Sequence, residues 1–171
     1  MIKRLKYIWD IESTGLDPLD SRIVCVSIID LQTDEVKTFI GQDEKKVLTE
    51  FWERVKGSVE LIGFNSDGFD MPFIIKRSLI NHVKTNPDVK STDIRKSVNG
   101  FWFSYNARSR GTLSDWAKIL KIPVESEAGN AIPLLFVENK FDEIEKHCVE
   151  DVTITRKLLE LAEYCNVMRS K

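Results

Sequence analysis

The chain contains 171 residues, of which 42% are hydrophobic and 30% charged, a composition typical of one globular domain with a full hydrophobic core. The sequence has no apolar run of the roughly 18 residues that a membrane span requires and no secretory signal, which excludes an integral membrane protein and leads us to expect a cytoplasmic location. The net charge of −2 does not by itself indicate nucleic-acid binding.

The charged residues are unevenly distributed along the chain. Residues 71–121 include ten Lys or Arg and three Asp or Glu, so this segment carries +7 and the remainder −9. Such a basic segment favours a surface that attracts a polyanion such as nucleic acid. The alternative is that these cations are scattered over solvated helix faces.

Hydrophobic periodicity indicates an α/β protein. Alternating and β-branched runs predict strands over residues 7–12, 22–30, 36–40, 59–64 and 89–94. Helical spacing predicts helices over 44–56, 70–82, 112–120 and 141–164, and the pair Asn99-Gly100 predicts a hairpin that continues into the aromatic segment Phe101–Tyr105. The order of these elements predicts a mixed five-stranded sheet, its first three strands antiparallel, with helices on both faces.

The first predicted strand contains two acidic residues, Asp10 and Glu12, directly before a turn at residues 13–15. Strand geometry places both side chains on one face, where two desolvated carboxylates repel each other. A divalent cation such as Mg²⁺ or Mn²⁺ would relieve that repulsion, since these ions prefer oxygen ligands. The alternative is that one acid is solvated and the other pairs with a Lys or Arg.

Two later helices add ionisable residues. Asp70 lies at the start of the helix predicted from residue 70, with Pro72 in its first turn, where an acid also interacts favourably with the helix dipole. In the last helix, residues spaced four and three apart form a stripe that is ionisable at one end and apolar at the other: His147, Asp151, Ile154, Leu158, Leu161 and Cys165. Burial of the apolar end would bring His147 and Asp151 inward, either as functional groups or as a satisfied core pair.

Three cysteines lie in apolar segments without metal-ligand spacing: Cys25, Cys148 and Cys165. Their odd number and surroundings predict reduced, buried thiols. Three of the four tryptophans are assigned to the core: Trp9, Trp52 and Trp116. We expect His82 at the surface, near the end of a helix.

Three motifs along the chain carry a family resemblance. The first is Asp10-Ile11-Glu12-Ser13-Thr14-Gly15-Leu16. The second, Asn-Ser-Asp-Gly-Phe-Asp-Met-Pro-Phe over residues 65–73, is close to the pattern Asn-x-x-x-Phe-Asp-x-Pro, and the third is His147-x-x-x-Asp151. Together they resemble the DnaQ-like, or DEDD, 3′-to-5′ exonucleases, above all the proofreading domains of family B DNA polymerases and related stand-alone ribonuclease-H-like exonucleases. The third motif of that family is usually Tyr-x-x-x-Asp or His-x-x-x-x-Asp, so this chain has His at the tyrosine spacing.

The resemblance implies a ribonuclease H-like fold, a single exonuclease domain over residues 1–171, and hydrolysis assisted by two divalent cations, Mg²⁺ or Mn²⁺. In such an enzyme Asp10 would bridge both ions and His147 would act as general base. Three further acids would complete the ligand shells: Glu12, Asp70 and Asp151. The implied products are nucleoside 5′-monophosphates, released from a free 3′ end.

The resemblance also implies contacts with the terminal nucleotide of the substrate. Four residues are expected there: Thr14, Leu16, Asn65 and Phe69. Core packing is the alternative for Leu16 and Phe69. For the aromatic segment Phe101–Tyr105 we favour core burial or a subunit interface over stacking on bases.

The expected partner is single-stranded nucleic acid, DNA in preference to RNA, and no membrane. A homo-oligomer and assistance to a polymerase in trans stay open. Two other functions stay open as well: a structure-selective endonuclease of the same fold, and a non-catalytic nucleic-acid-binding or scaffold module. The presence of all four acids argues against the non-catalytic module, because such a protein has no reason to retain buried charges that repel one another.

Overall fold

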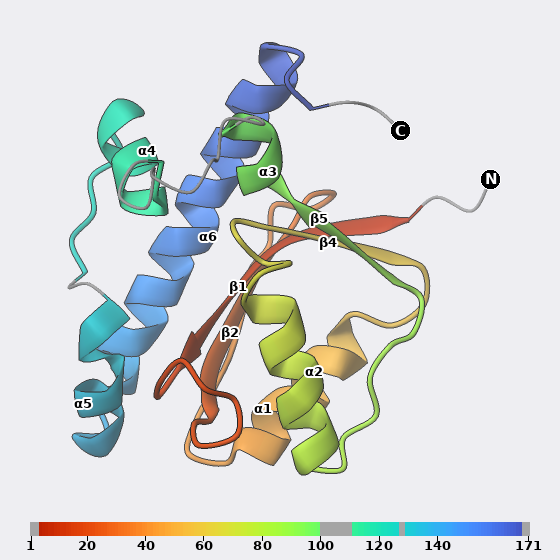
Figure 1. Cartoon of the computed structure of the whole chain (residues 1–171), viewed down its shortest axis with the longest axis vertical. Coiled ribbons are helices and arrows are strands. Elements are labelled where there is room, and N and C mark those ends of the chain that lie inside the picture. Colours follow the sequence, from red (N-terminus) through yellow and green to blue (C-terminus); the bar gives the residue numbers. More distant parts are fainter. Residues whose placement is uncertain (1–3, 100–110, 127–128, 169–171) are drawn as a thin grey trace.

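The computed structural model describes residues 4–99, 111–126 and 129–168, and the strands among them form one mixed sheet (Figure 1). The strands are β1 (Leu5–Ser13), β2 (Ile23–Asp30), β3 (Val36–Ile40), β4 (Val59–Gly63) and β5 (Val89–Asp93). They lie in the order β3-β2-β1-β4-β5. The β1–β2 and β2–β3 pairs are antiparallel, whereas β1–β4 and β4–β5 are parallel, which confirms the predicted sheet.

Helices cover both faces of this sheet. Their bounds are α1 (Glu44–Arg54), α2 (Asp70–Ile80), α3 (Ile94–Val98), α4 (Leu113–Ile119), α5 (Ile132–Val137) and α6 (Phe141–Tyr164), with a 3₁₀ turn, η1, at Gly129–Ala131. In Figure 1, α1 and α2 lie on one side of the sheet, and the long α6 crosses the other side with α4 and α5 beside it. The predicted arrangement of helices on both faces is therefore confirmed.

β1 is the middle strand, and its side chains alternate between the two helical layers. Three of them pack into a buried cluster with α1 and α2: Tyr7, Trp9 and Ile11. Ile8 points to the opposite face and packs in a second cluster with Val152 of α6. Because the side-chain period of a strand is two, Asp10 and Glu12 follow Ile8 on the α6 side of the sheet.

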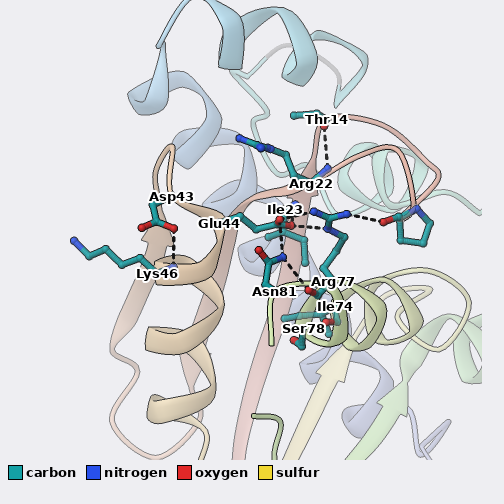
Figure 2. Close-up of polar contacts among 11 residues, drawn as sticks. Thr14, Arg22, Ile23, Asp43, Glu44, Lys46, Ile74, Arg77, Ser78 and Asn81 are labelled. Atoms are coloured by element: carbon teal, nitrogen blue, oxygen red, sulfur yellow. Dashed lines mark hydrogen bonds and ion pairs between the residues drawn. The ribbon is translucent and has the colours of Figure 1, made fainter. Parts of the chain in front are cut away.

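Side-chain caps explain where two predicted helices begin. The Asp43 carboxylate accepts a hydrogen bond from the Lys46 N–H at the start of α1 (Figure 2). Thr112 and Asp115 form a capping box at the start of α4, in which each side chain accepts a hydrogen bond from the backbone N–H of the other. The prediction that Thr112 is the N-cap of this helix is confirmed.

Two elements differ from the prediction. Residues 94–98 form α3 rather than the first strand of a hairpin, because the Asp93 carboxylate accepts the Arg95 N–H and starts a helix there. The second half of that hairpin, with the aromatic segment Phe101–Tyr105, lies outside the described residues. α5 was not predicted, because its sequence Ile-Pro-Leu-Leu-Phe-Val is apolar throughout and shows no helical period.

The stripe predicted along the last helix holds as far as Leu158 and is wrong beyond it. Leu158 is buried, but Leu161 is 36% exposed and Cys165 is exposed. Spacings of four and three residues repeat with a period of 3.5, and a straight α-helix drifts from that repeat by about 20° per heptad. In the last turns of α6 the buried residues are therefore Leu159 and Ala162 instead of Leu161 and Cys165.

The other core predictions are mostly confirmed. Of the tryptophans and cysteines predicted to be buried, four are: Trp9, Trp52, Cys25 and Cys148. Both of these cysteines are free thiols. Trp116 is only half-buried, because α4 packs at the margin of the second cluster and lets the indole N–H reach Asn99. His82 is exposed, as predicted.

A buried ion pair between Glu44 of α1 and Arg77 of α2 holds the loop that joins β1 to β2 (Figure 2). The Arg77 guanidinium donates to both Glu44 carboxylate oxygens, at 2.8 and 2.6 Å, and to the Pro18 carbonyl in the loop at 2.9 Å. Glu44 also accepts the Ile23 N–H at 2.7 Å, where the loop enters β2. Two helices thus fix both the middle and the end of this loop.

The pKa of Glu44 reflects these contacts. Burial alone would raise it, but hydrogen bonds from Arg77, Ile23 and Asn81 outweigh burial and hold the pKa below its ordinary value. Glu44 is therefore a charged, fully partnered carboxylate inside the protein.

We predict that Arg77→Met lowers the free energy of unfolding by about 3–5 kcal/mol, because it leaves the Glu44 carboxylate buried without its cation. Urea denaturation followed by circular dichroism measures this loss. Lys46→Met is the matched control, since it removes a cation from an exposed pair with Glu50 and should cost less than about 1 kcal/mol. Equal losses in the two variants would contradict the structural role of the buried pair.

Candidate metal centre

A cleft of about 310 Å³ opens where the end of β1 faces the starts of α2 and α4 and the middle of α6. It contains all four acids that the sequence analysis selected, together with His147. Its walls are formed by Asp10, Ile11, Glu12, Phe64, Asn65, Phe69, Asp70, Leu113, Ser114, His147 and Asp151. Residues more than 130 positions apart in the sequence thus share one cavity.

Two compact groups of possible ligand atoms lie at this cleft or directly behind its wall. One atom each from Glu12, His147 and Asp151 lies within 4.8 Å of the others, and the same holds for Asp10, Glu12 and Cys148. Glu12 belongs to both groups. The carboxylate oxygens are the ligands that Mg²⁺ and Mn²⁺ prefer, so the acids fit the expected ions. The Cys148 thiol does not add to this set, because burial raises its pKa and its Sγ donates to the Asp10 carbonyl oxygen.

Asp70 approaches the site from the start of α2. The pairing of β1 with β4 ends at Ile8, although β1 itself continues to Ser13. The backbone N–H of Ile11 can therefore bind a side chain instead of β4. It donates to the Asp70 carboxylate at 3.2 Å. Among the described residues neither compact group includes Asp70, so the structure brings this acid into the same cleft but not into the tightest cluster.

Burial raises the pKa values of all four acids, and the charges of neighbouring acids add to the shift. Burial is the main cause for Asp10, and the charges of Asp70, Asp151 and Glu12 add to it. For Glu12 burial again comes first, followed by Asp151 and Asp70. Each acid therefore disfavours ionisation of its neighbours.

The same causes act on the two acids from the helices. Burial raises the pKa of Asp70 to about 7, although hydrogen bonds from its own N–H and that of Ile11 oppose the shift. Burial raises the pKa of Asp151 to about 6, against the lowering effect of nearby His147. A cation bound in the cleft would oppose these shifts, because it favours the charged form of each acid.

His147 lies between the cleft and a loop. Its Nε2 is 3.6 Å from a Glu12 carboxylate oxygen, and its Nδ1 is 2.9 Å from the Ser126 hydroxyl on the opposite side. The four-residue spacing in α6 places the imidazole on the same side as Asp151. The sequence analysis did not anticipate Ser126, because only the folded chain brings it to α6.

The expected nucleotide contacts divide into two pairs. Asn65 and Phe69 line the cleft, and Phe69 also packs against Phe73 in the core, with ring centroids 5.2 Å apart. Thr14 and Leu16 lie in the loop after β1 and do not belong to the cleft walls. Leu16 is 84% exposed, so the alternative of core packing is wrong for this residue.

Hydrogen bonds hold two of these residues in place. The Thr14 hydroxyl accepts the Arg22 N–H across the loop, as Figure 2 shows. Asn65 has a left-handed backbone, with φ of 63°, and is fixed by Asp93 and Arg95. Strain of this kind persists only where the surroundings over-determine it, and it is common at functional sites.

Comparison with known proteins identifies the family. A family model described as the RNase_H superfamily matches residues 7–163. The chain belongs to the RNase H superfamily. This membership is consistent with nucleic-acid processing, and it confirms the ribonuclease H-like part of the expected fold.

The chain is similar to two further proteins, one in sequence and one in structure. The uncharacterized protein MJ0365 of Methanocaldococcus jannaschii is 29% identical over 177 residues, which cover 95% of this chain and 98% of the relative. The family B DNA polymerase of Pyrobaculum calidifontis superposes with a TM-score of 0.72 at 16% identity, over 94% of this chain. The chain spans only 24% of that polymerase, so the likeness concerns the fold. Among the described parts of this RNase H protein, no helix combines the length and apolarity needed to cross a membrane.

The acid cluster of this RNase H protein predicts how stability depends on pH when metal is chelated. Carboxyls with raised pKa values bind more protons in the folded than in the unfolded state, from the ordinary value of about 4 up to about 7 for Asp70. The free energy of unfolding therefore falls as the pH rises through this window. Asp70→Asn, which keeps an acceptor for the Ile11 N–H, should raise stability at about pH 7.5 by on the order of 2 kcal/mol.

Thermal denaturation in chelator and in Mn²⁺ checks this prediction. Mn²⁺ should raise the melting temperature of the native chain and flatten its pH dependence, because a bound cation replaces the protons. Asp142→Asn, at an exposed position in the first turn of α6, is the control and should change neither property. Stability that is indifferent to Mn²⁺ would contradict the metal centre.

Proposed function

We propose that this protein is a metal-dependent 3′-to-5′ exonuclease that degrades single-stranded nucleic acid, DNA in preference to RNA, to nucleoside 5′-monophosphates. The observation that carries the proposal is the convergence of four carboxylates and one histidine in a single cleft. The pKa values of the four carboxylates are raised, as expected for metal ligands when the metal is absent. Membership in the RNase H superfamily and the fold shared with a family B DNA polymerase support nucleic acid as the substrate class.

Each acid has a proposed role set by its position. The charges of Asp70, Asp151 and Glu12 all raise the pKa of Asp10, so this carboxylate lies near all three. As the family resemblance implies, Asp10 is the proposed shared ligand of two Mg²⁺ or Mn²⁺ ions, and Glu12, Asp70 and Asp151 would complete the two sets of ligands. When bound, such ions neutralise charge on the phosphate and make water more acidic.

His147 is the proposed general base. Its Nε2 faces Glu12 in the cleft, where a proton can be taken from an attacking water. The burial of the cleft strengthens every charge interaction within it.

The substrate would enter with its 3′ end beside Asn65 and Phe69. Phe69 offers an aromatic surface at the cleft, and Asn65 a rigid amide. Thr14 and the exposed Leu16 lie on the loop fixed by Arg77, where they are proposed to contact the terminal nucleotide from the other side.

We predict that Asp10→Ala abolishes Mg²⁺-dependent shortening of a 5′-labelled single-stranded oligonucleotide, because it removes the shared ligand. Denaturing gels resolve the product ladder, and chelator should stop the reaction of the native chain. Asp142→Ala, which removes an exposed acid from the same protein, is expected to keep full activity.

The same gels separate the proposal from its alternatives. A blocked 3′ end should prevent digestion, and matched DNA and RNA strands should show faster loss of DNA. Cutting of a circular single strand would instead identify an endonuclease. Undiminished digestion by the Asp10→Ala variant would remove the metal-dependent mechanism.

We predict that His147→Ala lowers the rate of digestion by about 10²- to 10⁴-fold, the usual contribution of a general base. The rise in melting temperature caused by Mn²⁺ should persist, because the carboxylates remain. An unchanged rate would exclude His147 as the base, and loss of the Mn²⁺ response would make it a metal ligand instead.

A further inference from the structure

A chain of hydrogen bonds joins Glu150 to His147 through Ser126. The Ser126 hydroxyl donates to the Glu150 carboxylate, and its oxygen lies 2.9 Å from His147 Nδ1. Neither Ser126 nor Glu150 belongs to the proposed catalytic set. We propose that both are positioning residues, which hold His147 in the tautomer that carries its proton on Nδ1 and a free lone pair on Nε2.

Glu150 is fixed in the role of acceptor. Besides the Ser126 hydroxyl, its carboxylate accepts the backbone N–H of Glu125 at 3.2 Å and of Ser126 at 3.1 Å. Lys146 in the preceding turn of α6 pairs with Glu125 at 2.9 Å and ties the same segment to the helix. Three donors converge on this one carboxylate, which offers no proton in return.

Counting protons then assigns the tautomer. A serine hydroxyl has one hydrogen, and here it points to Glu150. The contact between Ser126 and His147 is a hydrogen bond only if Nδ1–H donates to the hydroxyl oxygen. In the neutral ring Nε2 therefore carries the lone pair, and its distance of 3.6 Å from Glu12 is too long for a hydrogen bond that would favour a proton there.

This assignment deepens the proposed function and depends on it for its catalytic meaning. A general base must present an unprotonated nitrogen to the proton it removes, and the partner of the other nitrogen decides which one that is. The imidazole is only 12% exposed, so water has little part in this choice. Without Ser126 the ring is free to adopt the tautomer with Nε2–H, which cannot accept a proton on the cleft side.

Nuclear magnetic resonance tests the tautomer without any assay of activity. The chain has two histidines, so ¹⁵N-histidine labelling gives one pair of ring nitrogens for His147 and one for the exposed His82, the internal reference. At a pH where both rings are neutral, we expect the Nδ1–H form for His147 in the native chain and in Ser126→Thr, which keeps the hydroxyl. Ser126→Ala should shift His147 to the Nε2–H form and leave His82 unchanged. The Nε2–H form in the native chain, or no change in Ser126→Ala, would overturn the proposal.

Kinetics test the consequence of the tautomer. On a single-stranded oligonucleotide, Ser126→Ala should lower kcat by about 10- to 100-fold with KM unchanged, a loss typical of residues that orient a catalytic group. Ser126→Thr should restore the rate. Thr153→Ala, which removes a hydroxyl of α6 that donates to the Val149 carbonyl, is the control and should keep the native rate.

A double variant distinguishes positioning from a general loss of structure. In a His147→Ala background, Ser126→Ala should cause no further loss, because Ser126 acts only through the imidazole. An independent, additive loss would overturn the positioning role. If the native chain digests no substrate, the proposed exonuclease fails, while the tautomer is still decided by the ¹⁵N spectra.

Discussion

Mutual repulsion among buried carboxylates on the α6 side of the sheet is the constraint on which the site depends. β1 is paired with β2 from Tyr7 to Ser13, and this pairing holds Asp10 and Glu12 on one face of the sheet. Asp70 is tied to β1 through the Ile11 N–H, and Asp151 is held by the packing of Val152 and the rest of α6 against the sheet. Their charge must therefore be balanced by protons or by cations.

The protein contains a second buried acid that shows the opposite behaviour. Glu44 is as well buried as Asp70, yet its pKa is lowered because Arg77, Ile23 and Asn81 supply hydrogen bonds and charge. The pKa of Asp70 is raised mainly by burial, and the charges of Asp93 and Asp151 add to the shift. Glu44 thus has its hydrogen-bond and charge partners within the protein, whereas Asp70 is a carboxylate that an external ion would stabilise. The ion pair of Glu44 with Arg77 is also linked to the acid cluster, because it holds the loop that follows β1.

Strong local patterns made much of this architecture predictable from the sequence. The period of two in β1 fixes the shared face of Asp10 and Glu12, and capping residues fix the starts of α1 and α4. Elements without a period were not predictable: α5 is uniformly apolar, and α3 depends on a single aspartate cap. The cleft wall formed by Leu113 and Ser114 could not be anticipated either, since it results from the docking of α4 against other elements. Contacts between distant segments, such as that of Ser126 with His147, cannot be predicted from the spacing of residues along the sequence.

The third motif gains a physical explanation from the geometry of α6. Successive residues of a helix project about 100° apart, so neighbouring Glu150 and Asp151 face different surroundings. Residues three and four positions after His147 both lie on its side of the helix, which brings the imidazole between them. Asp151 faces the cleft, whereas Glu150 faces the segment that contains Ser126. A histidine four residues before the aspartate can thus be oriented by the helix itself, with its two ring nitrogens assigned to opposite sides. The spacing that departs from the usual form of the motif is therefore compatible with a base that is held in place by its own helix.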